Sequence, residues 1–179
     1  WSLMGVGCGP KGKIILVDDD KIEISNLSRQ LLFRGSDVGQ NKSVVAARAV
    51  REINEAINVE TKEMRVCWET QHVFNDQFFQ SLDIMVGGVD NRKARWELDT
   101  KAVLHGKYYF ESGTQGFAAN SQVIIPNYSV TYTDANPMGA DKVDNTPSCT
   151  IKSFPHLLIH CISWAKEEFN TLLKELIDK

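Results

Sequence analysis

The sequence lacks the features that mark several large classes of protein. Among its 179 residues no apolar run approaches the length of a transmembrane helix, and no secretory leader is visible. There is no basic excess: the formal net charge is −3, which argues against a general nucleic-acid-binding protein. Hydrophobic residues make up 42% and charged residues 24%, the balance of an ordinary globular chain. We therefore expect a soluble protein that binds neither membranes nor nucleic acid.

The four cysteines include no C-x-x-C pair and no Cys/His group with zinc spacing. Cys149, His156, His160 and Cys161 lie close together in the sequence, which leaves a zinc site as one reading. The apolar helical pattern around His160 and Cys161 favours ordinary packing instead. Because no leader is visible, thiols of this kind indicate a reducing compartment, so we expect a cytoplasmic and nuclear protein.

The first residues resemble the end of a helix rather than the start of a protein. Apolar residues at Trp1, Leu3 and Met4 run into a glycine-rich stretch at 5–9, and no initiating methionine is present. We expect the chain to be a piece of a longer protein.

Short apolar runs alternate with helical patterns along the first 126 residues. We expect strands at 13–17, 59–66, 83–89, 108–111 and 122–126, and helices at 41–57, 75–82 and 92–105. This alternation predicts an α/β fold, with βαβ units forming a Rossmann-like, mostly parallel sheet flanked by helices. In such sheets, ligands bind beyond the carboxyl ends of the strands.

The region 127–155 differs from what precedes it, because it is rich in proline, asparagine, serine and threonine. An irregular connection of this length is usually functional. A helix is expected to begin after Pro155, since apolar residues then recur at helical spacing as far as Leu176.

Polar residues that could bind a nucleotide follow the first predicted strand. Asp18 to Asp20 could accept hydrogen bonds from ribose hydroxyls, although a solvated turn would have the same composition. Arg29, in the stretch S-N-L-S-R-Q, could hold phosphate oxygens or form a surface ion pair. Lys42 opens a predicted helix, where a lysine and the helix dipole together favour an anion, yet exposed lysines are common.

A second group follows the strand predicted at 83–89. Asp90 is a hard carboxylate at a strand end and is suited to Mg²⁺. Asp90 or Asn91 could equally cap the helix predicted at 92–105. Both roles can be met together, with Asp90 on the metal and Asn91 as the cap.

Each signal is weak alone, but their combination resembles the ATP site of the ubiquitin-activating enzyme family. That family includes bacterial enzymes that adenylate sulfur-carrier proteins, and the likeness is strongest to the second, active adenylation repeat of the eukaryotic enzymes. The stretches that carry the resemblance are S-N-L-S-R-Q-L-L-F-R at 25–34, E-S-G-T-Q-G at 111–116, Q-V-I-I-P at 122–126 and C-T-I-K-S-F-P-H-L-L-I-H-C-I-S-W-A-K at 149–166.

The resemblance implies a role for each candidate residue. Asp18 would hold the ribose, and Val66 would lie near the adenine. Asp90 would bind Mg²⁺, with Asp20 as a second ligand. The triphosphate would be handled by Asn26, Arg29, Gln30 and Lys42, with Asn91 beside the nucleotide; Arg29, Lys42 and Asp90 would serve catalysis directly.

The resemblance also implies the reaction. ATP and the C-terminal carboxylate of ubiquitin or a ubiquitin-like protein would give an acyl-adenylate, which a cysteine in another domain captures before transfer to a conjugating enzyme. Arg29, Lys42 and Mg²⁺ would stabilise the developing phosphate charge. No general base is required, because the carboxylate is already ionised at neutral pH.

Domain boundaries follow from the same comparison. Residues 1–135 would form a partial adenylation domain, 136–155 a crossover loop, and 156–179 a helix leading toward the thioester domain. The family's glycine-rich phosphate loop is not visible here, so we expect the isolated chain to bind ATP weakly or not at all. Cys149 would lie in the crossover and would not form the thioester. The absence of C-x-x-C at 126–150 favours the ubiquitin-type enzyme over those for SUMO or NEDD8.

Other functions stay open at this stage. The chain could be a non-catalytic adenylation-like module that docks a ubiquitin-like protein, or part of an activating enzyme for a different ubiquitin-like or sulfur-carrier protein. A dinucleotide-dependent oxidoreductase is disfavoured, because no set of residues for handling a hydride is recognisable in the sequence.

Overall fold

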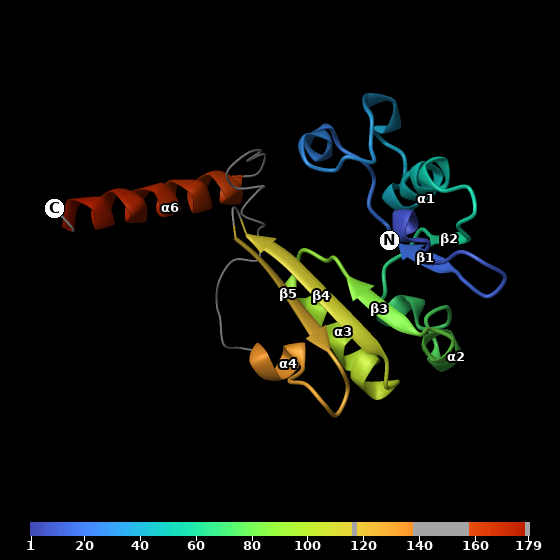
Figure 1. The fold of residues 1–179 in the computed structure, drawn as a ribbon. Helices are drawn as coiled ribbons and strands as arrows, with labels where there is room; N and C mark the ends of the chain where they lie inside the picture. The colour runs from blue at the N-terminus through green and yellow to red at the C-terminus, as the bar shows by residue number, and fades with distance from the viewer. Residues whose placement is uncertain (116–117, 138–157, 178–179) are drawn as a thin grey trace. The chain divides into compact units, whose positions relative to one another are not determined.

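The computed structural model describes residues 1–115, 118–137 and 158–177 (Figure 1). The chain separates into two compact units, Trp1–His72 and Val73–Lys179, and each is described by itself. Both units contain a parallel pair of strands together with helices, which confirms the expected α/β class.

The first unit is built on a parallel pair of strands and one long helix. Its elements are η1 (Ser2–Met4), β1 (Ile14–Val17), η2 (Ile24–Ser28), η3 (Gly35–Asp37), α1 (Lys42–Ile53), β2 (Val59–Lys62) and η4 (Trp68–Thr70). Ile14 lies opposite Val59 in the parallel register. The helical spacing of apolar residues in α1 brings Ala47 against Ile57 and Val59, which form the buried core of this unit.

The start of the chain, where the sequence predicted the end of a helix, forms a short 3-10 turn. η1 ends at Gly5, whose φ of 78° lies in the left-handed region that glycine adopts without strain. Cys8 then forms an antiparallel bridge with Ile57, which fixes this segment on the unit.

The second unit contains a three-stranded sheet. Its elements are α2 (Asp76–Gln80), β3 (Ile84–Gly87), α3 (Arg92–Leu104), β4 (Tyr108–Gln115), β5 (Ala118–Ile124), α4 (Tyr132–Ala135) and α6 (Leu158–Ile177). β3 and β4 are parallel, and β4 and β5 are antiparallel. The sheet is therefore mixed, with the parallel pair joined by the α3 crossover.

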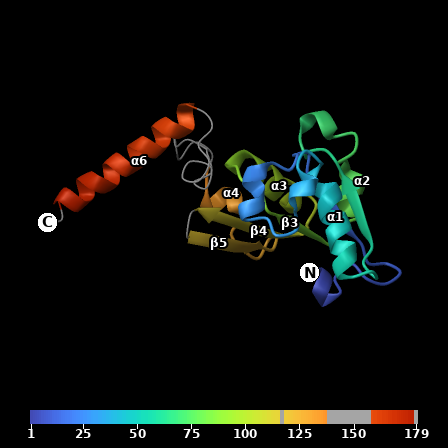
Figure 2. The ribbon, with the colours of Figure 1, turned by 90° about the horizontal axis from the view of Figure 1, so that it is seen from above.

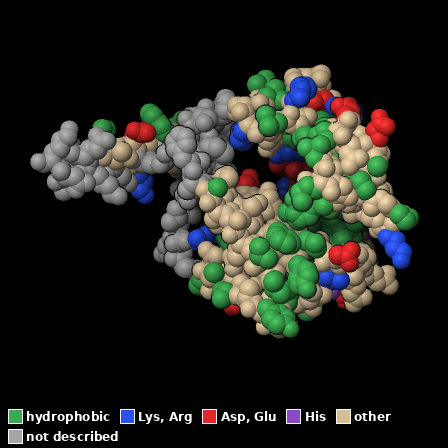
Figure 3. Space-filling model, viewed as in Figure 1, with side chains coloured by type: hydrophobic (Ala, Val, Ile, Leu, Met, Phe, Trp, Pro, Cys, Tyr) green, Lys and Arg blue, Asp and Glu red, His purple; other side chains and the backbone are tan. Residues whose placement is uncertain are grey.

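One face of this sheet is buried and the other is exposed. α3 lies against one face (Figure 1 and Figure 2), where Met85, Tyr109 and Ile124 are buried. Side chains alternate between faces along a strand, so Ile84 and Tyr108 are on the opposite, exposed face. Figure 3 shows hydrophobic side chains at the surface over this part of the unit.

Several element boundaries differ from the sequence predictions. The strand predicted at 59–66 ends at Lys62, because the last ladder bond beyond β1 runs from the Asp18 amide to the Lys62 carbonyl. The strand predicted at 108–111 continues to Gln115, because β5 begins early enough to pair with it, at Ala118.

The region predicted to be irregular contains a short helix, α4. The buried carboxylate of Asp99, on α3, accepts hydrogen bonds from the Tyr132 and Thr133 amides at 3.1 and 2.9 Å and from the Thr133 hydroxyl at 2.7 Å. This tertiary contact supplements the local N-cap, Thr131, whose hydroxyl accepts from the Asp134 amide at 3.0 Å. The crossover predicted at 136–155, which includes Cys149, lies outside the described residues from 138 onward, and so does His156.

The last helix agrees with the prediction, since α6 runs from Leu158 to Ile177. Within the described residues, no helix combines the length and apolar character that crossing a bilayer requires.

Candidate functional site

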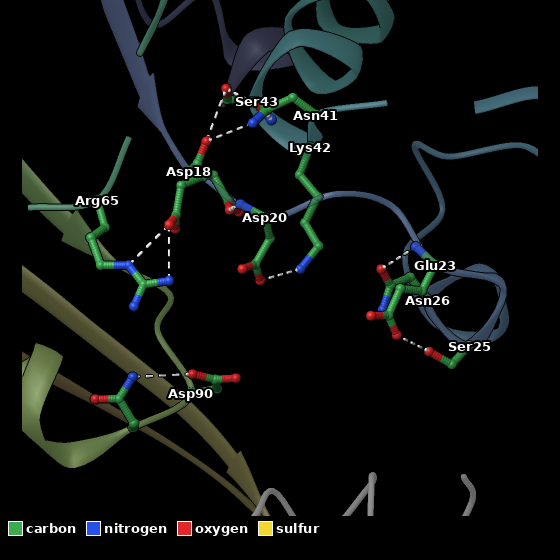
Figure 4. Close-up of polar contacts among 12 residues, drawn as sticks. Asp18, Asp20, Glu23, Ser25, Asn26, Asn41, Lys42, Ser43, Arg65 and Asp90 are labelled. Atoms are coloured by element: carbon green, nitrogen blue, oxygen red, sulfur yellow. Dashed lines mark hydrogen bonds and ion pairs between the residues drawn. The ribbon is translucent and has the colours of Figure 1, made fainter. Parts of the chain in front are cut away.

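The end of β1 is tied to the start of α1 through the backbone of Asp18 (Figure 4). The Asp18 carbonyl accepts hydrogen bonds from Asn41 Nδ2 at 3.2 Å and from Ser43 Oγ at 3.4 Å. Asn41 also caps α1, because its Oδ1 accepts from the Ser43 amide at 2.9 Å. The acidic strand end and the positive end of the helix dipole are thereby held together.

The three carboxylates after β1 each have a different partner. Asp18 Oδ1 accepts from the Asp20 amide at 2.8 Å. Asp20 Oδ2 pairs with Lys42 Nζ at 2.7 Å, and Asp19 Oδ2 pairs with Arg65 Nη2 at 2.9 Å (Figure 4). One oxygen from each carboxylate lies within 4.8 Å of the others. Asp19 and Asp20 are exposed, so these pairs can exchange partners with a ligand at small cost.

Asp18 differs from its two neighbours because it is half-buried. Burial raises the pKa of its carboxyl, and the charges of Asp20 and Asp19 act in the same direction. The Asp20 amide and the Lys42 ammonium oppose this rise in the pKa. A desolvated acceptor of this kind is suited to hydroxyl donors such as those of a ribose.

Lys42 is the first residue of α1, as the sequence predicted. Its amide donates to the Asp20 carbonyl at 2.9 Å, and its ammonium pairs with the Asp20 side chain. Only 17% of the Lys42 side chain is exposed, so the cation is held in place beside the acidic strand end.

The S-N-L-S-R-Q stretch runs through the tight turn η2 and ends just after it, with Arg29 as the C-cap residue and Gln30 next, and the structure gives these residues different environments. Asn26 is buried, and its Oδ1 accepts from the Glu23 amide at 3.0 Å (Figure 4). Arg29 is exposed, and its Nη1 donates to the Ser25 carbonyl at 2.8 Å. Gln30 Oε1 is buried without a hydrogen-bond partner among the described residues. Asn26 therefore shapes the turn, while Arg29 projects from it.

Val66 was predicted to stand at the end of a strand, and the structure does not place it there. β2 ends four residues earlier, at Lys62, and Val66 is half-buried in an irregular segment. Its assignment beside an adenine stays a prediction that no contact of the structure tests.

Asp90 and Asn91 lie in the second unit, between β3 and α3. Asn91 caps α3, because its Oδ1 accepts from the Ala94 amide at 2.8 Å. Asn91 Nδ2 donates to Asp90 Oδ1 at 3.3 Å, and the Asp90 carboxylate is exposed (Figure 4). A hydrated Mg²⁺ needs only one or two protein carboxylates, so an exposed Asp90 fits the donor set that such an ion requires.

The structure therefore brings together part of the predicted set. Asp18, Asp20 and Lys42 form one bonded group, and Asn26, Arg29 and Gln30 lie on or just after one turn. Asp90 and Asn91 belong to the other unit, and their convergence with the first group on one magnesium–nucleotide pocket stays a prediction.

Two contributors to the site were not singled out from the sequence. Arg65 pairs with Asp19, which lies 46 positions away in the sequence, and no local pattern predicts such a contact. Asn41 could have been found, because an asparagine directly before a helix start is a typical N-cap.

The similarity of this chain to known families and proteins agrees with the resemblance that its motifs indicated. The model of the ThiF family matches residues 1–172. The "Ubiquitin-activating enzyme E1 2" of Arabidopsis thaliana is 44% identical over 174 residues, which is 97% of this chain and 16% of that protein. The human "Ubiquitin-like modifier-activating enzyme 1" is 41% identical over 175 residues, or 98% and 16% of the two chains. The chain thus spans about a sixth of these relatives.

A solved structure gives the same result for the fold. The crystal structure of Escherichia coli MccB with ATP superposes with a TM-score of 0.58 at 28% sequence identity. The match covers 68% of this chain and 36% of that one.

Proposed function

Since this chain belongs to the ThiF family, as the match over residues 1–172 establishes, we propose that it is part of a ubiquitin-activating enzyme. In this proposal it takes part in the ATP- and Mg²⁺-dependent adenylation of the C-terminal carboxylate of ubiquitin. The observation that carries the proposal is the bonded group of Asp18, Asp20 and Lys42 at the junction of β1 and α1. It occurs in a chain 44% identical to a ubiquitin-activating enzyme.

The reaction requires positive charge near the phosphates and does not require a general base. A carboxylate oxygen of ubiquitin attacks the α-phosphorus of ATP, a new P–O bond forms, and the bond to the β-phosphate breaks as pyrophosphate leaves. Both reactants are anionic, so the barrier depends on cancelling their repulsion. The attacking carboxylate carries no proton at neutral pH, so no residue has to remove one.

The proposed roles follow from the environments of the side chains. Asp18, a half-buried acceptor, binds the ribose hydroxyls. Lys42, at a helix start, and Arg29, exposed on its turn, bind phosphate oxygens and stabilise the charge that develops on them. Because the pair between Lys42 and Asp20 lies partly in solvent, Lys42 can give up this partner when a triphosphate arrives.

Asp90 would hold Mg²⁺, with Asp20 as a second carboxylate. When bound, the ion supplies Lewis-acid stabilisation of the phosphate charge and of the leaving pyrophosphate. Asn91 fixes the Asp90 side chain through its amide while it caps α3.

The partners follow from the reaction. Ubiquitin or a ubiquitin-like protein is the substrate, a cysteine in another domain accepts the acyl group as a thioester, and a conjugating enzyme receives it next. Cys8, Cys67 and Cys161 are free thiols, which is consistent with our proposal of a cytoplasmic and nuclear location.

Pyrophosphate exchange tests this proposal. The longer protein that carries this chain is incubated with ATP, magnesium chloride and labelled pyrophosphate, together with ubiquitin or one of a panel of ubiquitin-like proteins. We expect label to enter ATP only when ubiquitin is present, because the adenylation step must run in reverse for exchange to occur.

Ubiquitin with an amidated C-terminus is the matched control, since it keeps the fold and loses the attacking carboxylate. We expect no exchange with this control. Equal exchange with the amidated protein, or without any ubiquitin, would contradict the proposed reaction. Stimulation by another ubiquitin-like protein alone would show that the substrate assignment is wrong.

A further inference from the structure

A buried ion pair lies in the second unit, outside the residues assigned to the nucleotide. Arg95 Nε, on α3, lies 3.0 Å from Oε1 of Glu111, on β4. The Glu111 residue is 1% exposed, and neither of its carboxylate oxygens makes a well-aligned hydrogen bond. Burial raises the pKa of the Glu111 carboxyl, and the Arg95 charge opposes that rise. The pair takes no part in the chemistry derived above.

Arg95 makes a second contact, at the turn that carries Asp90. Its Nε and Nη2 donate to the Val89 carbonyl at 3.2 and 2.8 Å, one residue before Asp90. The guanidinium thus joins three elements: the helix α3 that bears it, the strand β4 through Glu111, and the turn after β3. No other side chain among the described residues is recorded as donating to the Val89 carbonyl.

Gly113 makes room for this arrangement. A Cβ at this position would lie 2.6 Å from Arg95 Nη2 and 2.8 Å from Arg95 Nη1. The φ of Gly113 is not in the left-handed region, so the backbone conformation itself does not require glycine. The requirement comes from the close approach of the guanidinium to the β4 backbone.

Stability alone is a weak reason to keep such a pair. Removing two charges from water costs several kcal/mol, and apolar residues of the same volume often stabilise a fold equally well. A charged fork can, however, hold a carbonyl at a fixed distance from a strand, which an apolar side chain cannot do.

We propose that Arg95 and Glu111 are positioning residues for Asp90, with Glu111 orienting the Arg95 guanidinium and Arg95 fixing the turn at Val89. This inference rests on the proposed function, because it assigns the magnesium ligand to Asp90. It adds that magnesium affinity depends on a buried pair that touches neither the ion nor the nucleotide.

The first experiment measures magnesium dependence in the longer protein that carries the chain. Arg95→Gln removes the charged fork, and Gly113→Ala displaces it by steric contact. In pyrophosphate exchange, we expect each variant to raise the magnesium chloride concentration at half-maximal rate by about tenfold, the usual effect of losing a residue that orients a metal ligand. The rate at saturating magnesium should stay within about threefold of the unsubstituted protein.

The double variant and a control sharpen the result. If both substitutions act through the same guanidinium, Arg95→Gln combined with Gly113→Ala should shift the magnesium dependence no further than either alone. Lys101 lies on the same helix as Arg95, and Lys101→Met removes a cation from over the Phe79 ring of α2; this variant should cause no shift. A merely structural pair would lower the maximal rate and the thermal stability while leaving the half-maximal magnesium concentration unchanged, and that result would overturn the proposal.

A second measurement separates this inference from the proposed function. In the chain itself, ¹⁵N relaxation reports the backbone order parameters of residues 88–91. We expect values near those of a rigid backbone, about 0.85, to fall below about 0.6 in Arg95→Gln and in Gly113→Ala, and to stay unchanged in Lys101→Met. Unchanged values in the first two variants would overturn the positioning role even if exchange occurs. Lost order without any exchange activity would contradict only the proposed reaction.

Discussion

The charged side chains near the end of β1, in the first unit, and the carboxylates buried beside α3, in the second unit, have opposite environments. In the first unit, Asp20 and Arg65 are exposed and form pairs that lie partly in water. In the second unit, Asp99 and Glu111 are each 1% exposed and are held by several contacts or by a guanidinium. Exposed charges exchange partners readily, while buried ones fix geometry. In the proposed function, the exposed charges near the end of β1 receive a ligand, while the buried carboxylates of the second unit fix the backbone around them.

The strongest way to test this contrast is to break the buried pair. Glu111→Ala leaves the Arg95 guanidinium without its counter-charge in a mostly buried position, which typically costs about 3 kcal/mol or more in the free energy of unfolding. Urea denaturation of the chain measures the change. A loss below about 1 kcal/mol would show that the pair behaves like a surface contact, and would remove the contrast between the units.

The half-buried carboxyl of Asp18 is expected to give a smaller effect that depends on pH. Its folded-state pKa is raised above the ordinary value of 3.8, mainly by burial. The folded state therefore binds this proton more tightly than the unfolded state, so its contribution to stability is present below the ordinary pKa and is lost as the pH rises through the folded-state pKa.

Asp18→Asn removes this titration and keeps a side-chain oxygen that can accept from the Asp20 amide. We expect the variant to gain stability relative to the unsubstituted chain as the pH is raised from about 3 to about 7. Urea denaturation at a series of pH values measures the difference. A difference that is constant across this range, or that changes in the opposite direction, is incompatible with a raised pKa.

The smallest effect is expected at the exposed pair of Asp19 and Arg65. Arg65→Ala should lower the free energy of unfolding by less than about 1 kcal/mol, because the Arg65 side chain is 67% exposed and solvent screens the pair. The effect should also shrink in high salt. A loss as large as that of Glu111→Ala would mean that the first unit depends on its charges in the same way as the second.

Much of the fold could be predicted from local patterns. The strand at Ile14–Val17 and the helix at Arg92–Leu104 follow from apolar runs and capping residues, which act within a few positions of sequence. Strand lengths were less accurate, because β4 extends to Gln115 only through its pairing with β5. α4 was missed because it has only four residues, too few to show a helical pattern, although Thr131 caps it locally and Asp99, more than thirty positions away, holds its first amides.

The residues of the candidate site divide in the same way, into those with a local sequence signal and those that depend on distant contacts. Asp18, Lys42 and Asp90 could be found because they stand beside strand ends or helix starts, where polar residues carry a recognisable signal. Arg65 and Glu111 could not, because an ion pair between distant segments leaves no pattern in either one. Val66 was placed at a strand end that the structure puts at Lys62, since the composition of a segment does not reveal where its pairing stops.

The most direct test of the central claim is ubiquitin-dependent pyrophosphate exchange by the Asp90→Ala variant of the longer protein that carries this chain. Asp83→Ala, an exposed carboxylate just before β3, is the matched control. If Asp90 holds the magnesium ion of an adenylation site, the Asp90→Ala rate falls by about a hundredfold or more, since a metal ion supplies several kcal/mol of charge stabilisation, and the control stays near the original rate. An unchanged rate in Asp90→Ala would contradict the account.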